Sequence, residues 1–196
     1  MPDQFEDPVL ASVAAYSTNP DEYERRYENH LLDRPARFVS LLPKAARILD
    51  LGCGPGRDLR LFTEAGHDPI GVELNPSFAH MARRHGNVLE IDIRTIEEIF
   101  PPLSFEGIWA QASLVHLSTP DIAKLLRDIA SLLVPEGRFY ACVPAIGETG
   151  WHHEPDGRRW YTIWPDDAFR IAVENAGFHV DDVIDGPYVE VWATKK

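Results

Sequence analysis

The sequence predicts an α/β fold in which a mostly parallel β-sheet carries helices on both faces. From Ile48 onward, short apolar runs alternate with segments of helical periodicity, a pattern typical of strand–helix–strand units. The last two runs, residues 178–184 and 188–193, are separated by residues 185–187 alone, which leaves no room for a crossover helix. They are expected to form a hairpin, so that one strand runs antiparallel to the others.

Each expected element follows from a local signal. Two helices are expected to end at Gly66 and Gly86, because glycine favours the left-handed conformation found just beyond a helix. Another helix should begin at Pro120 with Thr119 as its N-cap, since apolar residues then recur at spacings of three and four. The other expected helices are 57–65, 76–84 and 165–176, and the expected strands are 48–51, 70–73, 88–92, 107–110, 138–143, 178–184 and 188–193.

The chain is expected to fold as a single domain spanning residues 1–196. Domains usually contain about 100–200 residues, and a composition of 44% hydrophobic and 26% charged residues is typical of globular proteins. Residues 1–45, which are rich in tyrosine, are expected to form a helical N-terminal cap over the sheet. Residues 144–164 are expected to form a long irregular loop on the substrate side, since long loops in compact domains tend to carry function.

Charge, hydropathy and cysteine content exclude several classes of protein. Lysine and arginine total 19 against 31 aspartates and glutamates, and the net charge of −12 argues against broad contact with nucleic-acid phosphates. The longest uncharged stretch, 107–120, is too short and too polar to span a bilayer. The acidic N-terminus does not resemble a secretory signal, and two distant cysteines fit a reducing cytosol. We therefore expect a cytoplasmic protein that binds neither nucleic acid nor membranes.

The most informative motif is Ile-Leu-Asp-Leu-Gly-Cys-Gly-Pro-Gly-Arg-Asp at residues 48–58. Its glycines, Gly52, Gly54 and Gly56, lie between a predicted strand and a predicted helix. Such a turn lets backbone N–H groups approach a ligand, and the helix N-terminus adds positive potential. A dinucleotide fingerprint would require glycine at position 57, where this chain has Arg57, so an NAD(P) oxidoreductase is disfavoured.

Acidic residues follow the predicted strands at the same edge of the sheet. Glu73 ends the second strand and is suited to accept the hydroxyls of a ribose, and Asp92 ends the third, where an adenine amino group would be read. The carboxyl ends of neighbouring strands would then line one crevice. The alternative is that Asp50 and Glu73 only cap helices or bind water.

These features, together with residues 105–116, resemble the class I S-adenosylmethionine-dependent methyltransferases, and the resemblance runs from about Tyr23 to the C-terminus. It implies a Rossmann-like sheet of seven strands in the order 3-2-1-4-5-7-6, with strand 7 antiparallel, and S-adenosylmethionine as the cofactor. The implied cofactor-binding residues are Asp50, Gly52, Cys53, Gly54, Asp58, Glu73, Leu74, Asp92, Ile93, Gln111 and Ala112.

The resemblance also implies a role for each part of this set. Residues 52–54 would contact the methionyl portion through their backbone, and Asp58 would lie near its ammonium or carboxylate group. Glu73 would bind the ribose, Leu74, Asp92 and Ile93 the adenine, and residues 111–112 would close the site beneath the sulfonium. The family's Asn-Pro-Pro-Tyr signature, which accompanies methylation of planar amide or base nitrogens, is replaced by Gln-Ala-Ser-Leu at 111–114.

Candidate catalytic and substrate-binding residues lie outside the cofactor motifs. His116 follows the fourth strand and is the best candidate for a general base, the alternative being a structural histidine at the start of a helix. His152 and His153 are adjacent and lack a closed set of further ligands, so no metal site is expected. The candidate substrate-binding residues are Tyr16, Tyr23, Trp151, Arg159 and Trp160, as parts of a lid, an aromatic wall or an anion-binding group.

The sequence therefore predicts an enzyme that transfers a methyl group from S-adenosylmethionine to an oxygen or nitrogen atom of a small molecule. Two alternatives remain open. One is a non-catalytic module that binds the cofactor, and the other is a tRNA or protein methyltransferase. The identity of the acceptor and the oligomeric state do not follow from the sequence, because acceptor choice depends on sites rather than on the fold.

Overall fold

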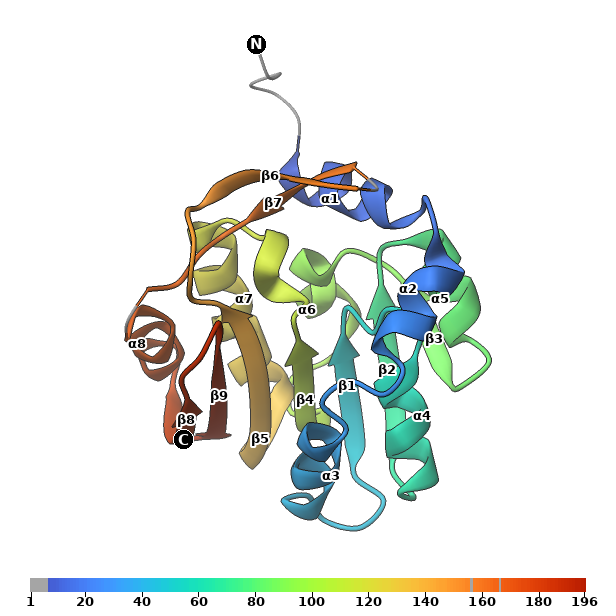
Figure 1. Ribbon diagram of the computed structural model, residues 1–196. Helices are drawn as coiled ribbons and strands as arrows, with labels where there is room; N and C mark the ends of the chain where they lie inside the picture. The colour runs from blue at the N-terminus through green and yellow to red at the C-terminus, as the bar shows by residue number, and fades with distance from the viewer. Residues whose placement is uncertain (1–6, 156, 166) are drawn as a thin grey trace.

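The computed structural model describes residues 7–155, 157–165 and 167–196. Within these ranges the centre of the molecule is a seven-stranded sheet of order β3-β2-β1-β4-β5-β9-β8 (Figure 1). β9 runs antiparallel to β5 and β8, whereas the pairs on the β1 side are parallel. This confirms the predicted fold and strand order. The strands of the sheet are β1 (Arg47–Leu51), β2 (Asp68–Glu73), β3 (Asn87–Glu90), β4 (Phe105–Gln111), β5 (Leu133–Pro144), β8 (Phe178–Ile184) and β9 (Tyr188–Lys195).

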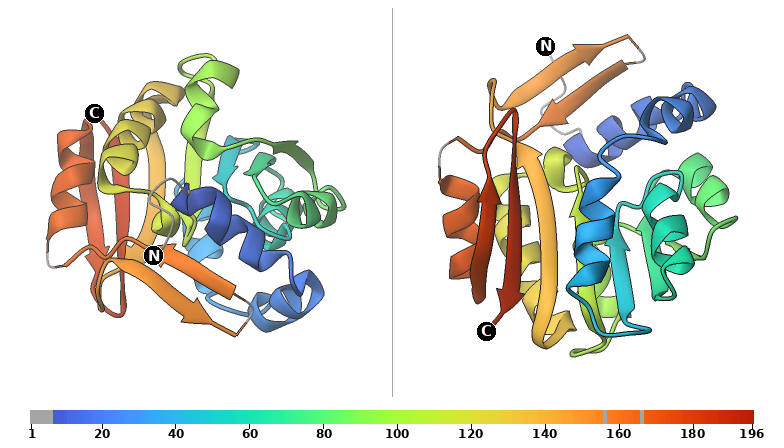
Figure 2. Two further views of the ribbon diagram at one scale, coloured as in Figure 1. Left: turned by 90° about the horizontal axis from the view of Figure 1, so that it is seen from above. Right: turned by 60° about the horizontal axis from the view of Figure 1, so that its bottom comes forward.

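Helices cover both faces of the sheet, as Figure 2 shows from two further directions. The helices are α1 (Pro8–Tyr16), α2 (Pro20–Tyr27), α3 (Asp33–Ser40), α4 (Arg57–Glu64), α5 (Pro76–Ala82), α6 (Ile96–Ile99), α7 (Thr119–Leu132) and α8 (Ala168–Asn175), with short 3-10 turns at η1 (Ile93–Thr95) and η2 (Leu114–His116). The first three lie in the segment predicted to be a helical cap, of which residues 1–6 are outside the described residues. Helix α1 lies above the carboxyl ends of the strands, and α3 packs on one face of the sheet (Figure 1). Below, the cap means α1 and α2. In the described part of the chain, no helix has both the length and the apolar character needed to cross a bilayer.

The alternation of side chains along the strands creates two separate apolar layers. Trp109, Tyr140 and Trp192 are paired in register on adjacent strands, and their rings pack at centroid distances of 4.1 and 4.4 Å on the side covered by α3 and α4. Their neighbours Ile108 and Phe139 point to the opposite face and pack with α7 and α8. The aromatic layer lies next to the glycine turn and, as described below, supports one of its carboxylates.

Part of the segment 144–164 is more regular than the predicted loop. It contains a two-stranded hairpin, β6 (Gly150–Glu154) and β7 (Gly157–Tyr161), stabilised by cross-strand pairs such as Trp151 with Trp160. The Trp160 N–H donates to Ser12 Oγ at 2.8 Å, so the hairpin packs on α1. Figure 1 shows both elements above the carboxyl ends of the strands. The sequence did not predict these strands because both faces of the hairpin are partly exposed, so polar and apolar residues do not alternate along them.

Two local boundaries also differ from the predictions. Asp92 does not end β3 but lies beyond it as the N-cap of η1, where its carboxylate accepts from the Arg94 N–H at 2.9 Å. Ser118, not Thr119, is the N-cap of α7, and its hydroxyl oxygen accepts from the Asp121 N–H at 3.3 Å. In both cases a short polar side chain satisfies an N–H group that the helix leaves without a partner.

Candidate active site

The described residues enclose two neighbouring pockets at the carboxyl ends of the parallel strands. The larger has a volume of about 760 Å³ and the smaller about 90 Å³. Tyr16, Tyr23, Gly52, Gly54 and Ala112 line both. The glycine turn and the end of β4 therefore lie at the boundary between the pockets, which is where ligands bind in open α/β sheets.

The three glycines of the turn serve different purposes. Gly52, Gly54 and Gly56 have φ angles of +64°, +56° and +96°, in the left-handed region that favours glycine. A Cβ atom at Gly52 would lie 2.6 Å from the Ser113 Cβ, and one at Gly56 would lie 2.8 Å from the Ala82 Cα. A Cβ atom at Gly54 would meet no protein atom within 4 Å. Gly52 and Gly56 are thus required by packing, whereas the open space at Gly54 fits a ligand.

Glu73, at the end of β2, stabilises the glycine turn by hydrogen bonding. Its carboxylate accepts from the Gly54 N–H at 2.9 Å and from the Asn75 N–H at 2.7 Å. Burial raises the pKa of Glu73, and these backbone hydrogen bonds oppose the rise. Glu73 also lines the smaller pocket together with Leu74 and Ile93, so a ribose bound there would meet a fixed acceptor.

A pair of buried carboxylates faces the larger pocket. Asp58 is held by Arg57, at 2.7 and 2.9 Å, and by the Trp109 Nε1–H at 2.9 Å. Asp50 is 3% exposed, and its Oδ2 atom has no hydrogen-bond partner among the described residues. Burial, with Asp58 nearby, raises the pKa of Asp50. A buried acceptor without a partner is unfavourable, so Asp50 fits a site for a ligand that donates hydrogen bonds, such as an ammonium group.

The end of β4 contributes further unsatisfied groups. Gln111 Oε1 and Ser113 Oγ are buried atoms without a hydrogen-bond partner in the described part of the chain. Between them, Ala112 has a left-handed φ of +52°, and its N–H donates to Cys142 Sγ at 3.2 Å. Burial raises the pKa of Cys142 to about 11, so this sulfur is a neutral thiol at pH 7. Residues held in such a conformation are frequently found at ligand sites.

Two further residues expected to contact the cofactor, Cys53 and Asp92, also form hydrogen bonds within the protein. The Cys53 N–H donates to the Val72 oxygen at 3.1 Å, which ties the turn to β2, although Cys53 lines the larger pocket. Asp92 lines the smaller pocket, but its carboxylate accepts from the Arg94 guanidinium at 2.9 and 2.6 Å. Arg94 also binds Asp7 at the start of α1 at 2.8 Å. Arg94 thus connects Asp92, beside the smaller pocket, to the start of α1.

His116 lies beside the smaller pocket and forms a defined hydrogen-bonded pair with Tyr16. The His116 Nδ1 atom is 2.5 Å from the Trp160 carbonyl oxygen, which can only accept, so Nδ1 carries the proton. The Nε2 atom then accepts from the Tyr16 hydroxyl at 2.9 Å. Burial lowers the pKa of His116 to about 4 and raises the pKa of Tyr16 well above its usual value. At neutral pH both groups are uncharged, and the histidine is a proton acceptor of fixed tautomer.

The pKa of His116 predicts a pH-dependent stability. Its value of about 4 in the folded protein lies below the ordinary value of 6.5, so unfolding takes up a proton between these two pH values. The free energy of unfolding should therefore decrease as pH falls from 6.5 to 4, by about 3 kcal/mol in total from this group. Urea denaturation of wild type and His116→Asn at several pH values measures this difference. His179→Asn, at an exposed position, should follow wild type, and parallel curves for wild type and His116→Asn would contradict the assignment.

The lining of the larger pocket is rich in tyrosine. Its tyrosine lining consists of Tyr16, Tyr23, Tyr27, Tyr161 and Tyr188. Arg159, which is 7% exposed, also lines it and places its guanidinium 4.0 Å above the Tyr16 ring. The side chains of Trp151 and Trp160, in contrast, pack against each other on the hairpin and do not line either pocket.

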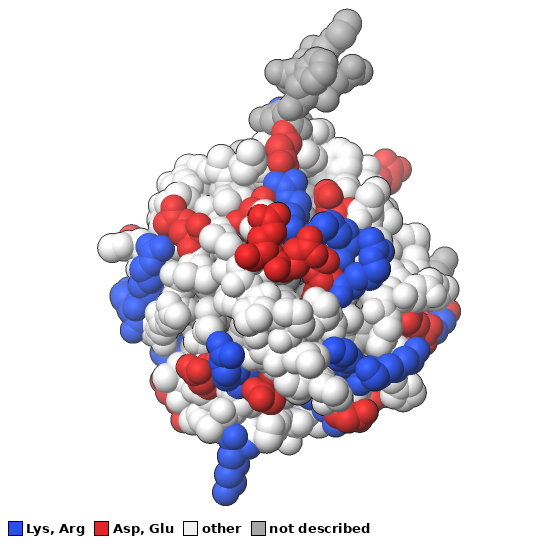
Figure 3. All heavy atoms as spheres, turned by 180° about the vertical axis from the view of Figure 1, so that it is seen from behind, with Lys and Arg blue, Asp and Glu red and all other residues white. Residues whose placement is uncertain are grey.

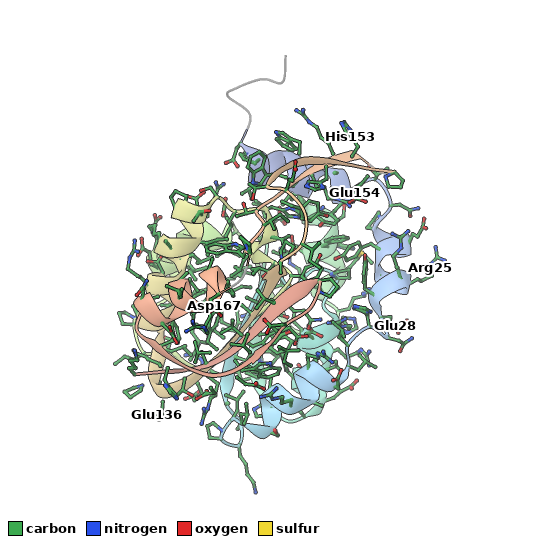
Figure 4. All side chains as sticks on the ribbon, turned by 60° about the vertical axis from the view of Figure 1, so that its left-hand side comes forward. Arg25, Glu28, Glu136, His153, Glu154 and Asp167 are labelled. Atoms are coloured by element: carbon green, nitrogen blue, oxygen red, sulfur yellow. The ribbon has the colours of Figure 1, made fainter. Side chains whose placement is uncertain are left out.

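The mouth of the larger pocket lies between the hairpin and α2. Glu154 from the hairpin and Arg25 and Glu28 from the α2 region are among its lining residues, and Figure 4 places the first above the other two.

His152 donates to the Glu148 carbonyl oxygen at 2.8 Å rather than facing a ligand cluster. Among the residues that the structure describes, no group of three or more histidines, cysteines or acidic residues is arranged to hold a metal ion.

Several residues that line the pockets or connect their parts were missed at the level of sequence. They are Arg57, Asn75, Phe78, Ser113, Cys142, Tyr188 and Glu190. Asn75 is the clearest example, because its Nδ2 donates to Val13 O and Ser17 Oγ, both at 3.0 Å, while its Oδ1 caps α5. The Asn-Pro pair at the start of a helix signals the cap, but nothing local signals the contact with α1.

Comparisons with known proteins agree with this geometry. A family model described as a methyltransferase domain matches residues 23–183, most of the chain. The chain belongs to this family. The methyltransferase is 30% identical over 184 residues to a ubiquinone biosynthesis O-methyltransferase of Xylella fastidiosa, a match that covers 84% of this chain and 72% of the relative. A relative of the same name from Rhodopseudomonas palustris is 33% identical over 140 residues, which cover 68% of this chain and 54% of that protein.

Solved structures share the fold of the methyltransferase. The 1,6-didemethyltoxoflavin-N1-methyltransferase of Burkholderia thailandensis, solved with 1,6-didemethyltoxoflavin and S-adenosylhomocysteine, has a TM-score of 0.78 at 24% identity and covers 100% of this chain and 93% of that one. An S-adenosylmethionine-dependent methyltransferase from Archaeoglobus fulgidus has a TM-score of 0.72 at 17% identity, covering 89% and 98%. With the family match, these findings confirm a class I methyltransferase that uses S-adenosylmethionine, an enzyme rather than a non-catalytic module.

Proposed function

We propose that this methyltransferase acts on an oxygen atom of a small aromatic molecule bound in the larger pocket. The observation that carries the proposal is the Tyr16–His116 pair, since a hydroxyl acceptor has to lose a proton on methylation. The curated relatives are named as O-methyltransferases, which supports the same choice. We further propose that residues 1–196 act as one domain, with the cap and the hairpin contributing to the acceptor side.

The residues present fit S-adenosylmethionine, which supplies a methyl group activated on a sulfonium. We propose that Asp50 and Asp58 hold its ammonium end, that the turn at Gly52–Gly54 lies against its methionyl part, and that Glu73 binds its ribose. The unpartnered Asp50 oxygen and the open space at Gly54 support this assignment. Positioning of the two reactants is expected to provide most of the catalysis, about 7–11 kcal/mol in well-oriented systems.

Tyr16 and His116 are proposed to remove the hydroxyl proton of the acceptor in one concerted step. The acceptor hydroxyl would donate to the Tyr16 oxygen while the Tyr16 proton passes to His116 Nε2, so that no tyrosinate forms. The raised pKa of Tyr16 favours this concerted path over a free tyrosinate. His116, with a pKa of about 4, can accept the proton only late in the reaction. By then, methylation of the acceptor oxygen has made the hydroxyl proton strongly acidic. The Trp160 carbonyl keeps the accepting nitrogen unprotonated.

The lining of the pocket favours a small planar acceptor over a nucleic acid. Tyrosine rings stack on planar groups, and an aromatic pair contributes about 0.5–1.5 kcal/mol beyond burial. The chain has a net charge of −12, and the face shown in Figure 3 carries acidic and basic side chains interspersed, without a continuous basic surface among the drawn residues. A tRNA substrate requires such a surface for its phosphates.

Release of S-adenosylhomocysteine from S-adenosylmethionine in a paired acceptor screen tests the proposal. Each aromatic ring is offered as a diol and as the corresponding diamine, for example catechol and 1,2-diaminobenzene, with bulk unmodified tRNA as a third arm. We expect kcat/KM to be at least about 100-fold higher for the diols. A preference for the amines would make the enzyme an N-methyltransferase, and turnover of tRNA alone would overturn the small-molecule assignment.

A further inference from the structure

Arg57 occupies a central place that no step of the proposed mechanism uses. Its guanidinium donates through Nε and Nη2 to both carboxylate oxygens of Asp58, at 2.7 and 2.9 Å. Through Nη1 it donates to the carbonyl oxygens of Tyr27 and His30, at 3.0 and 2.7 Å. The side chain is only 17% exposed. One largely enclosed cation thus joins the Asp58 carboxylate to the C-terminal end of α2 and the turn that follows it.

Apart from Arg57, the α2 segment is held by Tyr23, whose ring packs against those of Tyr16 and Phe78 at centroid distances of 5.3 and 5.0 Å. None of the residues of α2, all of which are described, is buried, and its composition is strongly polar. A surface ion pair between Arg84 and Glu24, at 2.6 Å, contributes little because it is solvent-exposed. Yet Tyr23, Tyr27 and His30 all line the larger pocket. At the C-terminal end of α2, where Tyr27 and His30 lie, the two hydrogen bonds from Arg57 hold this wall in position.

The cap also narrows the smaller pocket. Tyr16 and Tyr23 pack against Phe78 at centroid distances of 5.9 and 5.0 Å and line this pocket, whose volume is about 90 Å³. Pockets that hold small molecules usually measure about 300–1000 Å³. The smaller pocket lies below this range, so we infer that α1 and α2 move outward when the adenosine part of a cofactor enters it.

We propose that Arg57 is a positioning residue that couples closure of α2 to binding of the cofactor. When Asp58 is held by the cofactor and by Arg57 together, the guanidinium is oriented toward the Tyr27 and His30 carbonyls and retains the α2 segment over the site. Without those two hydrogen bonds, α2 opens more often and the cofactor dissociates faster. The proposal rests on the assignment of Asp58 to the cofactor site and is independent of the acceptor.

Two substitutions separate the two functions of the guanidinium. Arg57→Lys keeps a positive charge beside Asp58, but a single ammonium group cannot maintain the fork to the carboxylate and also bind both carbonyls. Arg57→Met removes both the positive charge beside Asp58 and the hydrogen bonds to the two carbonyls. Arg170→Lys is the matched control, because Arg170 also binds a carboxylate, that of Glu174 at 2.9 and 3.0 Å, on a helix that lines neither pocket.

The test combines calorimetry with S-adenosylhomocysteine and limited trypsin digestion, which cleaves an open α2 after Arg25 or Arg26. We expect Arg57→Lys to keep the wild-type melting temperature, because α2 opens locally. The Kd should rise by about 10- to 100-fold, because the cofactor then has to supply the free energy that closes α2. Cleavage in α2 should be faster and protection by S-adenosylhomocysteine weaker. Arg57→Met should show larger effects of the same kind, and Arg170→Lys should match wild type in both assays.

Other outcomes overturn the proposal in distinguishable ways. If Arg57→Lys binds S-adenosylhomocysteine as wild type does, or if its α2 is cleaved at the wild-type rate, Arg57 does not couple the two. If Kd rises with unchanged cleavage, Arg57 acts through Asp58 alone. If wild type itself fails to bind S-adenosylhomocysteine, the cofactor site is misplaced and the coupling fails with it. A failed acceptor screen with normal binding would leave the role of Arg57 intact.

Discussion

Replacing Gly54 by alanine is expected to weaken the binding of S-adenosylhomocysteine by about 100-fold or more while the protein still folds. Gly54 lines both pockets, and a Cβ atom there would project into space that the protein leaves open and that we assign to the ligand. Its φ of +56° adds backbone strain of about 1–2 kcal/mol for alanine. Valine at this position should abolish binding. Calorimetric titration, with melting curves to verify folding, measures the effect.

Gly66 provides the matched control for this substitution. It has a φ of +83°, and a Cβ atom there would also meet nothing within 4 Å, but it follows α4 and lines neither pocket. Gly66→Ala should therefore lose a similar amount of stability and bind S-adenosylhomocysteine as wild type does. Equal losses of affinity in the two variants would show that strain, not occupied space, explains the result. Normal binding by Gly54→Ala would place the cofactor elsewhere.

Removing the proton acceptor at position 116 is expected to reduce kcat for hydroxyl acceptors by about 10²- to 10⁴-fold, the usual contribution of a positioned base. His116→Asn keeps an N–H donor for the Trp160 carbonyl and lacks the Nε2 atom that accepts from Tyr16. Tyr16→Phe removes the other half of the pair and should give a loss of similar size. Steady-state release of S-adenosylhomocysteine measures kcat, and calorimetry shows that cofactor affinity changes by less than the rate.

A histidine outside the pockets separates this role from a general effect of the substitution. His67 Nδ1 accepts from the Ala46 N–H at 3.2 Å and lines neither pocket, so His67→Asn should leave kcat close to that of wild type. The effects of His116→Asn and Tyr16→Phe should not be additive, because each removes the same relay. If kcat stays at the wild-type value in both His116→Asn and Tyr16→Phe, His116 is structural and serves only to hold the hairpin on α1.

The sheet and the cofactor turn were predictable because their signals are local. A parallel strand, its glycine turn and the helix that follows occupy one short segment, and Glu73 lies at the end of the next strand. Repetition of this unit predicts a mostly parallel sheet, and the short connection 185–187 requires the terminal hairpin. The strand order was implied by the resemblance to the family. Boundaries were less predictable, as Asp92 and Ser118 show, because capping depends on backbone angles that single residues do not reveal.

The acceptor side could not be predicted in the same way. Tyr16 and His116 are 100 residues apart, and their contact depends on the packing of the hairpin onto α1. Trp151 and Trp160 are as aromatic as the tyrosines that line the pocket, yet they pair with each other instead. Composition indicates which side chains are able to contact an acceptor. Which of them line the pocket depends on the face of the strand from which each side chain projects.

Residues close along the chain predicted the strand–helix alternation and the terminal hairpin, and the glycine motif with Glu73 carried the resemblance that implied the family and the cofactor. Only the tertiary structure decided which nitrogen of His116 accepts a proton, which carboxylate oxygen lacks a partner, and that Arg57 joins Asp58 to the α2 segment. Those properties arise from burial and from contacts between distant segments. Both depend on how the cap, the hairpin and the sheet pack together.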